Sequence, residues 1–181
     1  MNTQIKKDLF RYVGEDCHRW LIQLRYIMFT PGFRYTYFMR KVQQGGILKL
    51  FWMVMLRLCM EGTLIQIPYQ TQIGEGLYIG HFGHIIINPD SKIGKNFNIA
   101  AGALIGNAEG KCAGTPTIGD NVKVGQNAIV IGKINLGNDV LIAPGAFVNF
   151  DVPDNCIVLG NPGKIIQRTS SPTSQYIVYP I

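Results

Sequence analysis

The sequence is poor in the residues that build metal and redox sites. Its 181 residues include three histidines and four cysteines, and charged side chains make up only 15% of the chain. No two cysteines stand at metal-ligand or redox spacing; they are Cys17, Cys59, Cys112 and Cys156. This scatter excludes a disulfide framework and indicates reduced thiols that mostly pack in the core.

Long hydrophobic runs are also missing. Charged and polar side chains interrupt the first twenty residues every few positions, so no secretory signal is indicated. The most apolar segment, residues 47–60, contains Lys49 and Arg57 and is too short to span a bilayer. We therefore expect the protein in the cytoplasm, with a place at the inner face of the membrane as an alternative.

The first third of the chain differs from the rest in charge. Residues 1–60 hold ten basic and three acidic side chains, a net charge of +7, and eleven of the nineteen aromatics; the remainder has a net charge of −1. The pattern predicts helices over residues 7–28, 32–44 and 47–60, within a basic, aromatic-rich helical region at 1–62. These helices either pack in an oligomer or lie on an anionic membrane surface. No motif for reading nucleic acid is present.

Glycine is abundant, with 21 residues, and from residue 73 onward a six-residue period appears. Aliphatic side chains recur at this spacing, with one slip of two residues and one interruption, at Ile73, Ile79, Ile85, Ile87, Ile93, Ile99, Ile105, Ile118, Val124, Val130, Leu136, Ile142 and Val148. A helix would show a period of 3.6 and a simple strand a period of 2, whereas six residues form one side of a triangular β-coil. Small residues after the aliphatic position let the chain bend. The residues expected to accept left-handed backbone at corners are Asn96, Asn98, Asp120, Asn121, Asn138 and Asp139.

Residues 73–166 resemble the left-handed β-helix acyltransferases built from hexapeptide repeats, and within them the serine O-acetyltransferase branch. The resemblance rests on GLYIGHFGHIII at residues 76–87, on IAAGALIGN followed by TPTIGDNVKVGQNAIVIG, and on VPDNCIVLGNPGKII. The opening IQIPYQTQIGEGLYIGHFG is closer still to the short acetyltransferases of capsule, exopolysaccharide and colanic-acid biosynthesis. The fold class is therefore expected to be mainly β, a left-handed parallel β-helix at residues 63–166, between a short N-terminal helical region and a tail at 167–181.

The resemblance implies acetyl-CoA as the donor, no required metal, a homotrimer, and active sites between subunits. It places the catalytic base at His81. A neutral imidazole suits this task because the acceptor hydroxyl must lose a proton at neutral pH. The two-residue slip follows His81 and should push a short segment out of the coil wall.

His84 stands where the family usually has glycine, so we expect it to line the acceptor pocket or to cap a corner. A zinc site is the alternative for the two histidines, as in the β-helical carbonic anhydrases. That site needs a third histidine, and only His18, outside the repeat, remains.

Two departures from the serine acetyltransferase pattern bear on the acceptor. Gln66 stands where the family has an aspartate that orients the base, and Gly114 and Thr115 replace a basic Arg-His pair that holds the carboxylate of the amino acid. A buried carboxylate without a charged partner is costly. We therefore expect a sugar or glycan hydroxyl as acceptor, with Gln66 or a backbone carbonyl orienting His81.

Donor contacts are implied by the resemblance at Gly106, Asn107, Gly125 and Ala143, with Lys164 at the nucleotide phosphates and Lys123 as an alternative. The loop at residues 107–117 is expected to project as an arm. Together these features predict an acetyl-CoA-dependent O-acetyltransferase of surface-polysaccharide synthesis. The alternatives are a serine O-acetyltransferase of cysteine biosynthesis and a non-catalytic scaffold or metal-binding trimer.

Overall fold

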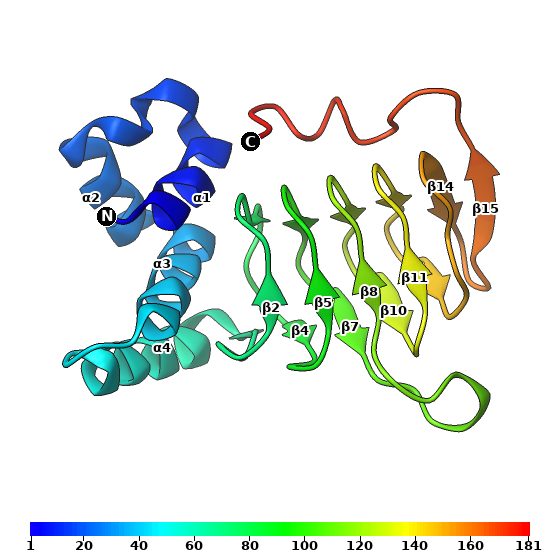
Figure 1. Ribbon diagram of the computed structural model, residues 1–181, viewed down its shortest axis with the longest axis horizontal. Coiled ribbons are helices and arrows are strands. Elements are labelled where there is room, and N and C mark those ends of the chain that lie inside the picture. The colour runs from blue at the N-terminus through cyan, green and yellow to red at the C-terminus, as the bar shows by residue number, and fades with distance from the viewer.

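The chain forms a helical region, a triangular prism of short parallel strands, and a tail that runs back along the prism, as the computed structural model shows (Figure 1). The structure describes residues 1–181, apart from the side chain of Lys111. Three sheets, which we call A, B and C, form the sides of the prism.

The strands of the three sheets are two to four residues long. Sheet A contains β1 (Ile65–Gln66), β4 (Ile85–Ile87), β7 (Leu104–Gly106), β10 (Ile129–Ile131) and β13 (Phe147–Val148). Sheet B contains β2 (Gln72–Ile73), β5 (Lys92–Ile93), β8 (Thr117–Ile118) and β11 (Asn135–Leu136). Sheet C contains β3 (Tyr78–Ile79), β6 (Asn98–Ile99), β9 (Lys123–Val124), β12 (Leu141–Ile142), β14 (Cys156–Leu159) and β15 (Lys164–Gln167).

From β1 to β12 the chain visits sheets A, B and C in turn, so each turn of the coil adds one strand to each side. The pairings are parallel throughout except between β14 and β15, which are antiparallel. All thirteen aliphatic residues of the six-residue period are buried inside the prism. The prediction of a mainly β, parallel-sheet fold with a helical region before it is confirmed.

The corners between sheets B and C explain why asparagine and aspartate recur there. Asn96, Asn121 and Asp139 have positive φ angles of 54°, 57° and 56°, as predicted. The other three predicted corner residues do not have this conformation. Asp120 and Asn138 instead accept hydrogen bonds from backbone amides of the preceding turn, at 2.7 and 2.8 Å, which ties successive turns together.

The helical region contains α1 (Thr3–Val13), a 3₁₀ turn η1 (Gly14–His18), α2 (Trp20–Phe29), α3 (Pro31–Gln44) and α4 (Lys49–Thr63). The prediction of one helix over residues 7–28 is wrong. Gly14, with a φ of +61°, ends α1, and the chain turns before α2 begins. The second predicted helix is confirmed as α3, and the third begins two residues later than predicted, after Gly45 and Gly46 with their positive φ angles.

The tail crosses the outer face of sheet C and returns to the helical region, as the red segment of Figure 1 shows. Ser171 donates to Asp139, and the side-chain amide of Asn98 donates to the carbonyl of Tyr176 at 3.1 Å. The tail therefore folds onto its own prism, because polar side chains of sheet C and of the corner before it bond to it.

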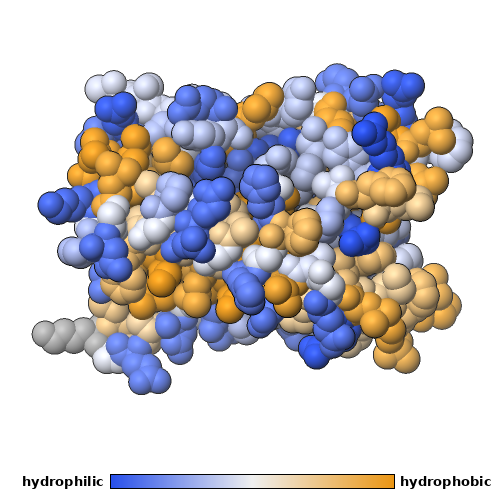
Figure 2. Space-filling view, turned by 180° about the vertical axis from the view of Figure 1, so that it is seen from behind, coloured by the Kyte–Doolittle hydropathy of each residue, from blue (hydrophilic) through white to orange (hydrophobic). Residues whose placement is uncertain are grey.

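Two helices expose apolar faces. No residue of α2 is buried, and α4 exposes Leu50, Phe51, Val54 and Leu58. Figure 2 shows apolar side chains gathered over the helical region, at the lower right of that view. Within the described residues, no helix combines the length and apolar character needed to cross a bilayer.

Candidate active site

A row of residues follows the edge of the prism where sheet C passes into sheet A. Four strands of sheet C, namely β3, β6, β9 and β12, each end on a buried aliphatic residue, and the residues that come next are Gly80, Ala100, Gly125 and Ala143. Leu159 continues the row in β14, and Lys164 pairs with Leu159 in β15. With strands about 4.8 Å apart, the row from Gly80 to Lys164 is about 24 Å long.

The first corner of this edge is irregular. Seven residues separate the buried Ile79 and Ile87, whereas five separate the corresponding buried residues in the later turns, as from Ile99 to Ile105. The two additional residues force the segment 81–84 away from the wall, with a φ of 118° at Gly83 and 21° at His84. The prediction that the slip pushes this segment outward is confirmed.

His81 lies in a cleft of about 420 Å³ beside this corner. Sheet C forms its floor and the tail forms one wall; the lining residues are Tyr78, Gly80, His81, Asn98, Ile99, Ala100, Lys123, Val124, Gln126, Gln175 and Tyr176. His81 is exposed, and within the described residues its imidazole has no hydrogen-bonding partner. His81 can therefore meet a molecule that enters the cleft.

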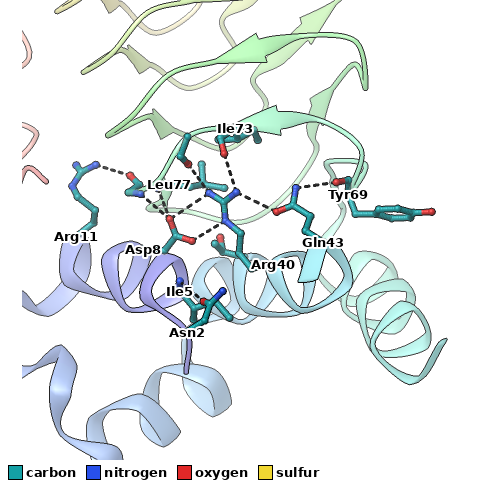
Figure 3. Close-up of polar contacts among 12 residues, drawn as sticks. Asn2, Ile5, Asp8, Arg11, Arg40, Gln43, Tyr69, Ile73 and Leu77 are labelled. Carbon is teal, nitrogen blue, oxygen red and sulfur yellow. Dashed lines mark hydrogen bonds and ion pairs between the residues drawn. The ribbon is translucent and has the colours of Figure 1, made fainter. Parts of the chain in front are cut away.

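The helical region holds the strand that leads to His81 (Figure 3). One carboxylate oxygen of Asp8 accepts hydrogen bonds from the amides of Gly76 and Leu77, at 2.8 and 2.9 Å, just before β3. Arg40 pairs with Asp8 at 2.9 Å and also donates to the carbonyls of Ile73 and Gly74. Burial, the largest influence, raises the pKa of Asp8, while Arg40 and the two amides act in the opposite direction.

One tyrosine forms hydrogen bonds to the backbone carbonyl and amide at the free edge of β3. The hydroxyl of Tyr12 donates to the carbonyl of Ile79 at 3.2 Å and accepts from its amide at 2.9 Å. Desolvation strongly raises the pKa of Tyr12, so this hydroxyl stays protonated. Gly32 of α3 lies so close to Ile79 that a Cβ there would meet the Ile79 carbonyl. The backbone two residues before His81 is thus held from two sides.

The structure brings together only part of the predicted site. Gly125 and Ala143 share the row that begins at Gly80, next to His81, and Lys164 lies at its far end. Gly106 and Asn107 lie elsewhere, at the end of β7 in sheet A, where the loop at 107–117 projects from the prism (Figure 1).

Gln66 and His84 do not line the cleft of His81. Gln66 is in β1 of sheet A, paired with Ile86, and lines a separate depression with residues of α4. Within the described residues no hydrogen bond joins Gln66 to His81, so this chain alone offers no support for Gln66 as the orienting residue. His84 is exposed at the end of the outward segment.

Several residues of the cleft carry no signal in the sequence. Gln175 and Tyr176 reach it only because the tail folds back, and they lie outside any repeat. Asn98 and Gln126 could be predicted from the repeat, since Asn98 precedes the buried Ile99 and Gln126 follows the buried Val124 by two positions. In the described part of the chain, no group of three or more His, Cys, Asp or Glu residues is arranged to hold a metal ion.

Comparison with known proteins gives one family match. Residues 115–149 match the model of the bacterial transferase hexapeptide (six repeats). The serine acetyltransferase of Synechococcus elongatus is 36% identical over 109 residues, which are 59% of this chain and 44% of that protein. The bifunctional protein GlmU of Prochlorococcus marinus is 32% identical over 110 residues, 61% of this chain and 24% of that protein. The chain thus spans less than half the length of these curated relatives.

Solved structures extend the likeness to the helical region. The serine acetyltransferase of Brucella abortus in complex with coenzyme A matches with a TM-score of 0.75 at 24% identity, over 92% of this chain and 68% of that chain. The serine acetyltransferase of Neisseria gonorrhoeae in complex with serine matches with a TM-score of 0.71 at 26% identity, over 90% and 67%. The fold of nearly the whole chain is therefore that of the serine acetyltransferases.

These findings correct the predicted acceptor. The relatives are serine acetyltransferases and GlmU proteins, so the predicted transfer to a sugar in surface-polysaccharide synthesis is wrong, and the alternative of serine is favoured. The prediction relied on the missing charges at Gln66, Gly114 and Thr115. Losing a charge at known positions excludes a carboxylate only if no other cation can reach it, and a sequence does not show which cations share a cleft.

Proposed function

We propose that the protein is an acetyl-CoA-dependent serine O-acetyltransferase, with His81 as general base, in a left-handed β-helix of hexapeptide repeats. One observation carries the proposal: His81 stands in a cleft at the irregular corner of a fold that matches serine acetyltransferases over nine-tenths of the chain. The rotation of the chain through three parallel sheets supports the β-helix.

In the proposed reaction His81 takes the proton of the serine hydroxyl through an imidazole nitrogen. The hydroxyl oxygen then forms a bond to the thioester carbon, and the carbon–sulfur bond breaks. The imidazolium returns its proton to the leaving thiolate, which yields O-acetylserine and free coenzyme A. Direct transfer of this kind needs no covalent enzyme intermediate.

The row from Gly80 to Lys164 suits the donor. Gly125 and Ala143 present almost no side chain, so an extended pantetheine arm can lie against the backbone along the edge. Lys164, about 24 Å from Gly80, is placed for the phosphates at the far end of the donor. These contacts remain proposals, as does the division of the chain at residues 62 and 166.

We propose a homotrimer as the assembly, in which Gly106, Asn107 and the projecting loop of one copy meet the cleft of another. The exposed apolar faces of α2 and α4 support contact between copies of the helical region. Sedimentation equilibrium tests this assembly, and a monomer at micromolar concentration would refute it. Contact with a membrane and location in the cytoplasm stay predictions; flotation with anionic liposomes tests the first.

The test of the function is thiol release from acetyl-CoA in the presence of L-serine. We expect serine-dependent release by the folded wild type, and a loss of about 10²–10⁴-fold in kcat for His81→Asn. His84→Asn is the matched control because it lies on the same exposed segment, and it should lose far less. No release above background by the wild type, or an unchanged rate for His81→Asn, would refute the proposal.

A further inference from the structure

The cleft of His81 contains a lysine whose ammonium group has no anionic partner. Lys123 stands on the outer face of sheet C, half-buried, with its Nζ atom 3.4 Å from the ring centroid of Tyr176. None of the ion pairs among the described residues involves Lys123. An aromatic ring stabilises a cation but does not neutralise it, so the positive charge remains in the cleft.

A second cation, which forms no ion pair among the described residues, lies behind the floor of the same cleft. Arg11 is 4% exposed and donates to the carbonyl of Gly76 and to the side chain of Asn98, both at 2.8 Å. Its Nε atom has no partner, and the buried carboxylate of Asp8 is paired with Arg40 instead. The cleft is therefore electropositive, because Lys123 on its floor and Arg11 behind it form no ion pair with an acidic side chain.

Burial acts on both cations in the same direction. Desolvation lowers the pKa of Lys123, and it lowers the pKa of Arg11 to about 10. A cation held where water is scarce gains most from an anion that enters the same space. The site therefore favours a small anionic ligand over a neutral one.

The position of Lys123 indicates which of two anionic groups it would meet in the proposed reaction, the phosphates of the donor or the carboxylate of the acceptor. Lys123 is two strands from Tyr78 in sheet C, about 10 Å, and lines the same cleft as His81. The phosphates of a donor that lies along the edge belong near Lys164, about 24 Å from Gly80. The anionic group nearest the reacting hydroxyl is the carboxylate of the acceptor.

Resting on the proposed function, we infer that Lys123 binds the carboxylate of the acceptor serine while His81 takes the proton of its hydroxyl. Arg11 adds to the positive potential behind Asn98. This contact replaces the basic pair missing at Gly114 and Thr115, where the threonine hydroxyl donates to the carbonyl of Asp90. The acceptor class is thus a hydroxy amino acid with a free carboxylate.

The experiment compares L-serine with serinamide, which keeps the hydroxyl and lacks the carboxylate, in the thiol-release assay. Lys123→Met should lower kcat/KM for serine about 10- to 100-fold, the usual worth of a hydrogen bond to a charged group. It should leave kcat/KM for serinamide and the KM for acetyl-CoA unchanged. Lys123→Arg should recover part of the loss, and thermal unfolding should show that each variant is folded.

Two control variants separate binding from structural support. Lys92→Met alters an exposed lysine on β5 of sheet B and should leave kcat/KM unchanged for both serine and serinamide. Tyr176→Leu removes the aromatic contact of Lys123 without removing the charge, so the preference for serine over serinamide should survive.

The outcomes are distinct. An equal loss of kcat/KM with both acceptors in Lys123→Met, or no loss at all, would overturn the inference about Lys123. The proposed function would still stand if the wild type uses serine. Failure of the folded wild type to use serine would overturn both together.

Discussion

The first turn of the prism and the turns that follow it differ at one edge. In the later turns five residues lead from one buried aliphatic position to the next around the corner of sheets C and A, and in the first turn seven do so. Strands β6, β9, β12 and β14 of sheet C have strands on both sides, whereas β3 has β6 on one side and the helical region on the other. The regular turns build a wall, and the irregular turn presents a histidine that the helices hold in place.

The largest effect is expected from removing the clamp, by which we mean the contacts of Asp8, Arg40 and Tyr12 with the first turn. Asp8→Ala would leave Arg40 buried without its partner, together with two amides of the first turn. We expect a loss of about 3–5 kcal/mol in the free energy of unfolding. Urea denaturation measures it. Glu61→Ala, which breaks the exposed ion pair with Arg57, should cost less than about 1 kcal/mol. Equal losses in the two variants would contradict the clamp.

The close approach of α3 to β3 gives a smaller effect. In Gly32→Ala the new Cβ would meet the backbone of Ile79, so the helix must shift, at a cost of about 3 kcal/mol. Gly62→Ala, on α4 with nothing within 4 Å of the new atom, should instead gain up to about 1 kcal/mol from helix propensity. Denaturation of both variants checks the sign, and a stabilised Gly32→Ala would show that the approach is not tight.

The hydroxyl of Tyr12 offers a finer test. Tyr12→Phe leaves both backbone groups of Ile79 without their partner and should cost about 1–2 kcal/mol. Because Ile79 lies two residues before His81, kcat should also fall while the KM for acetyl-CoA stays constant. Tyr26→Phe is the control, since this hydroxyl makes no hydrogen bond among the described residues. A wild-type kcat in Tyr12→Phe would show that the hydrogen bonds of Tyr12 to Ile79 do not affect catalysis by His81.

The smallest effect concerns the ion pairs between the helices and the prism. Lys7, at 2.7 Å, and Lys95 hold the pKa of Glu75 below its ordinary value. A carboxylate with a lowered pKa in the folded state contributes stability above its unfolded pKa of about 4.3, and this is lost as the pH falls through the folded pKa. Glu75→Gln should therefore be less stable than wild type by under 1 kcal/mol at pH 7, and the difference should shrink as the pH falls below about 4.3. A difference that persists unchanged in acid would point to another cause.

Much of the wall could be predicted from the residues. The six-residue period placed all thirteen aliphatic side chains in the core, and the two-residue slip marked the segment 81–84. The single helix predicted over residues 7–28 is wrong because Gly14, in the middle of an otherwise favourable pattern, adopts a positive φ angle that ends α1. The predicted acceptor is wrong because the positions of the family pattern do not show which other cations of the chain share the cleft.

By itself the sequence determined the prism and its irregular corner, since both follow from a repeated spacing that brings each strand beside its equivalent in the next turn, as Tyr78 beside Asn98. The tertiary structure alone decided what surrounds His81. Tyr176 reaches the cleft from 95 positions away from His81, and across more than sixty positions Asp8 bonds to the backbone just before β3 and Tyr12 bonds to β3. Contacts over such long sequence separations follow from how the helices and the tail pack against the prism, and the local spacing of residues does not predict them.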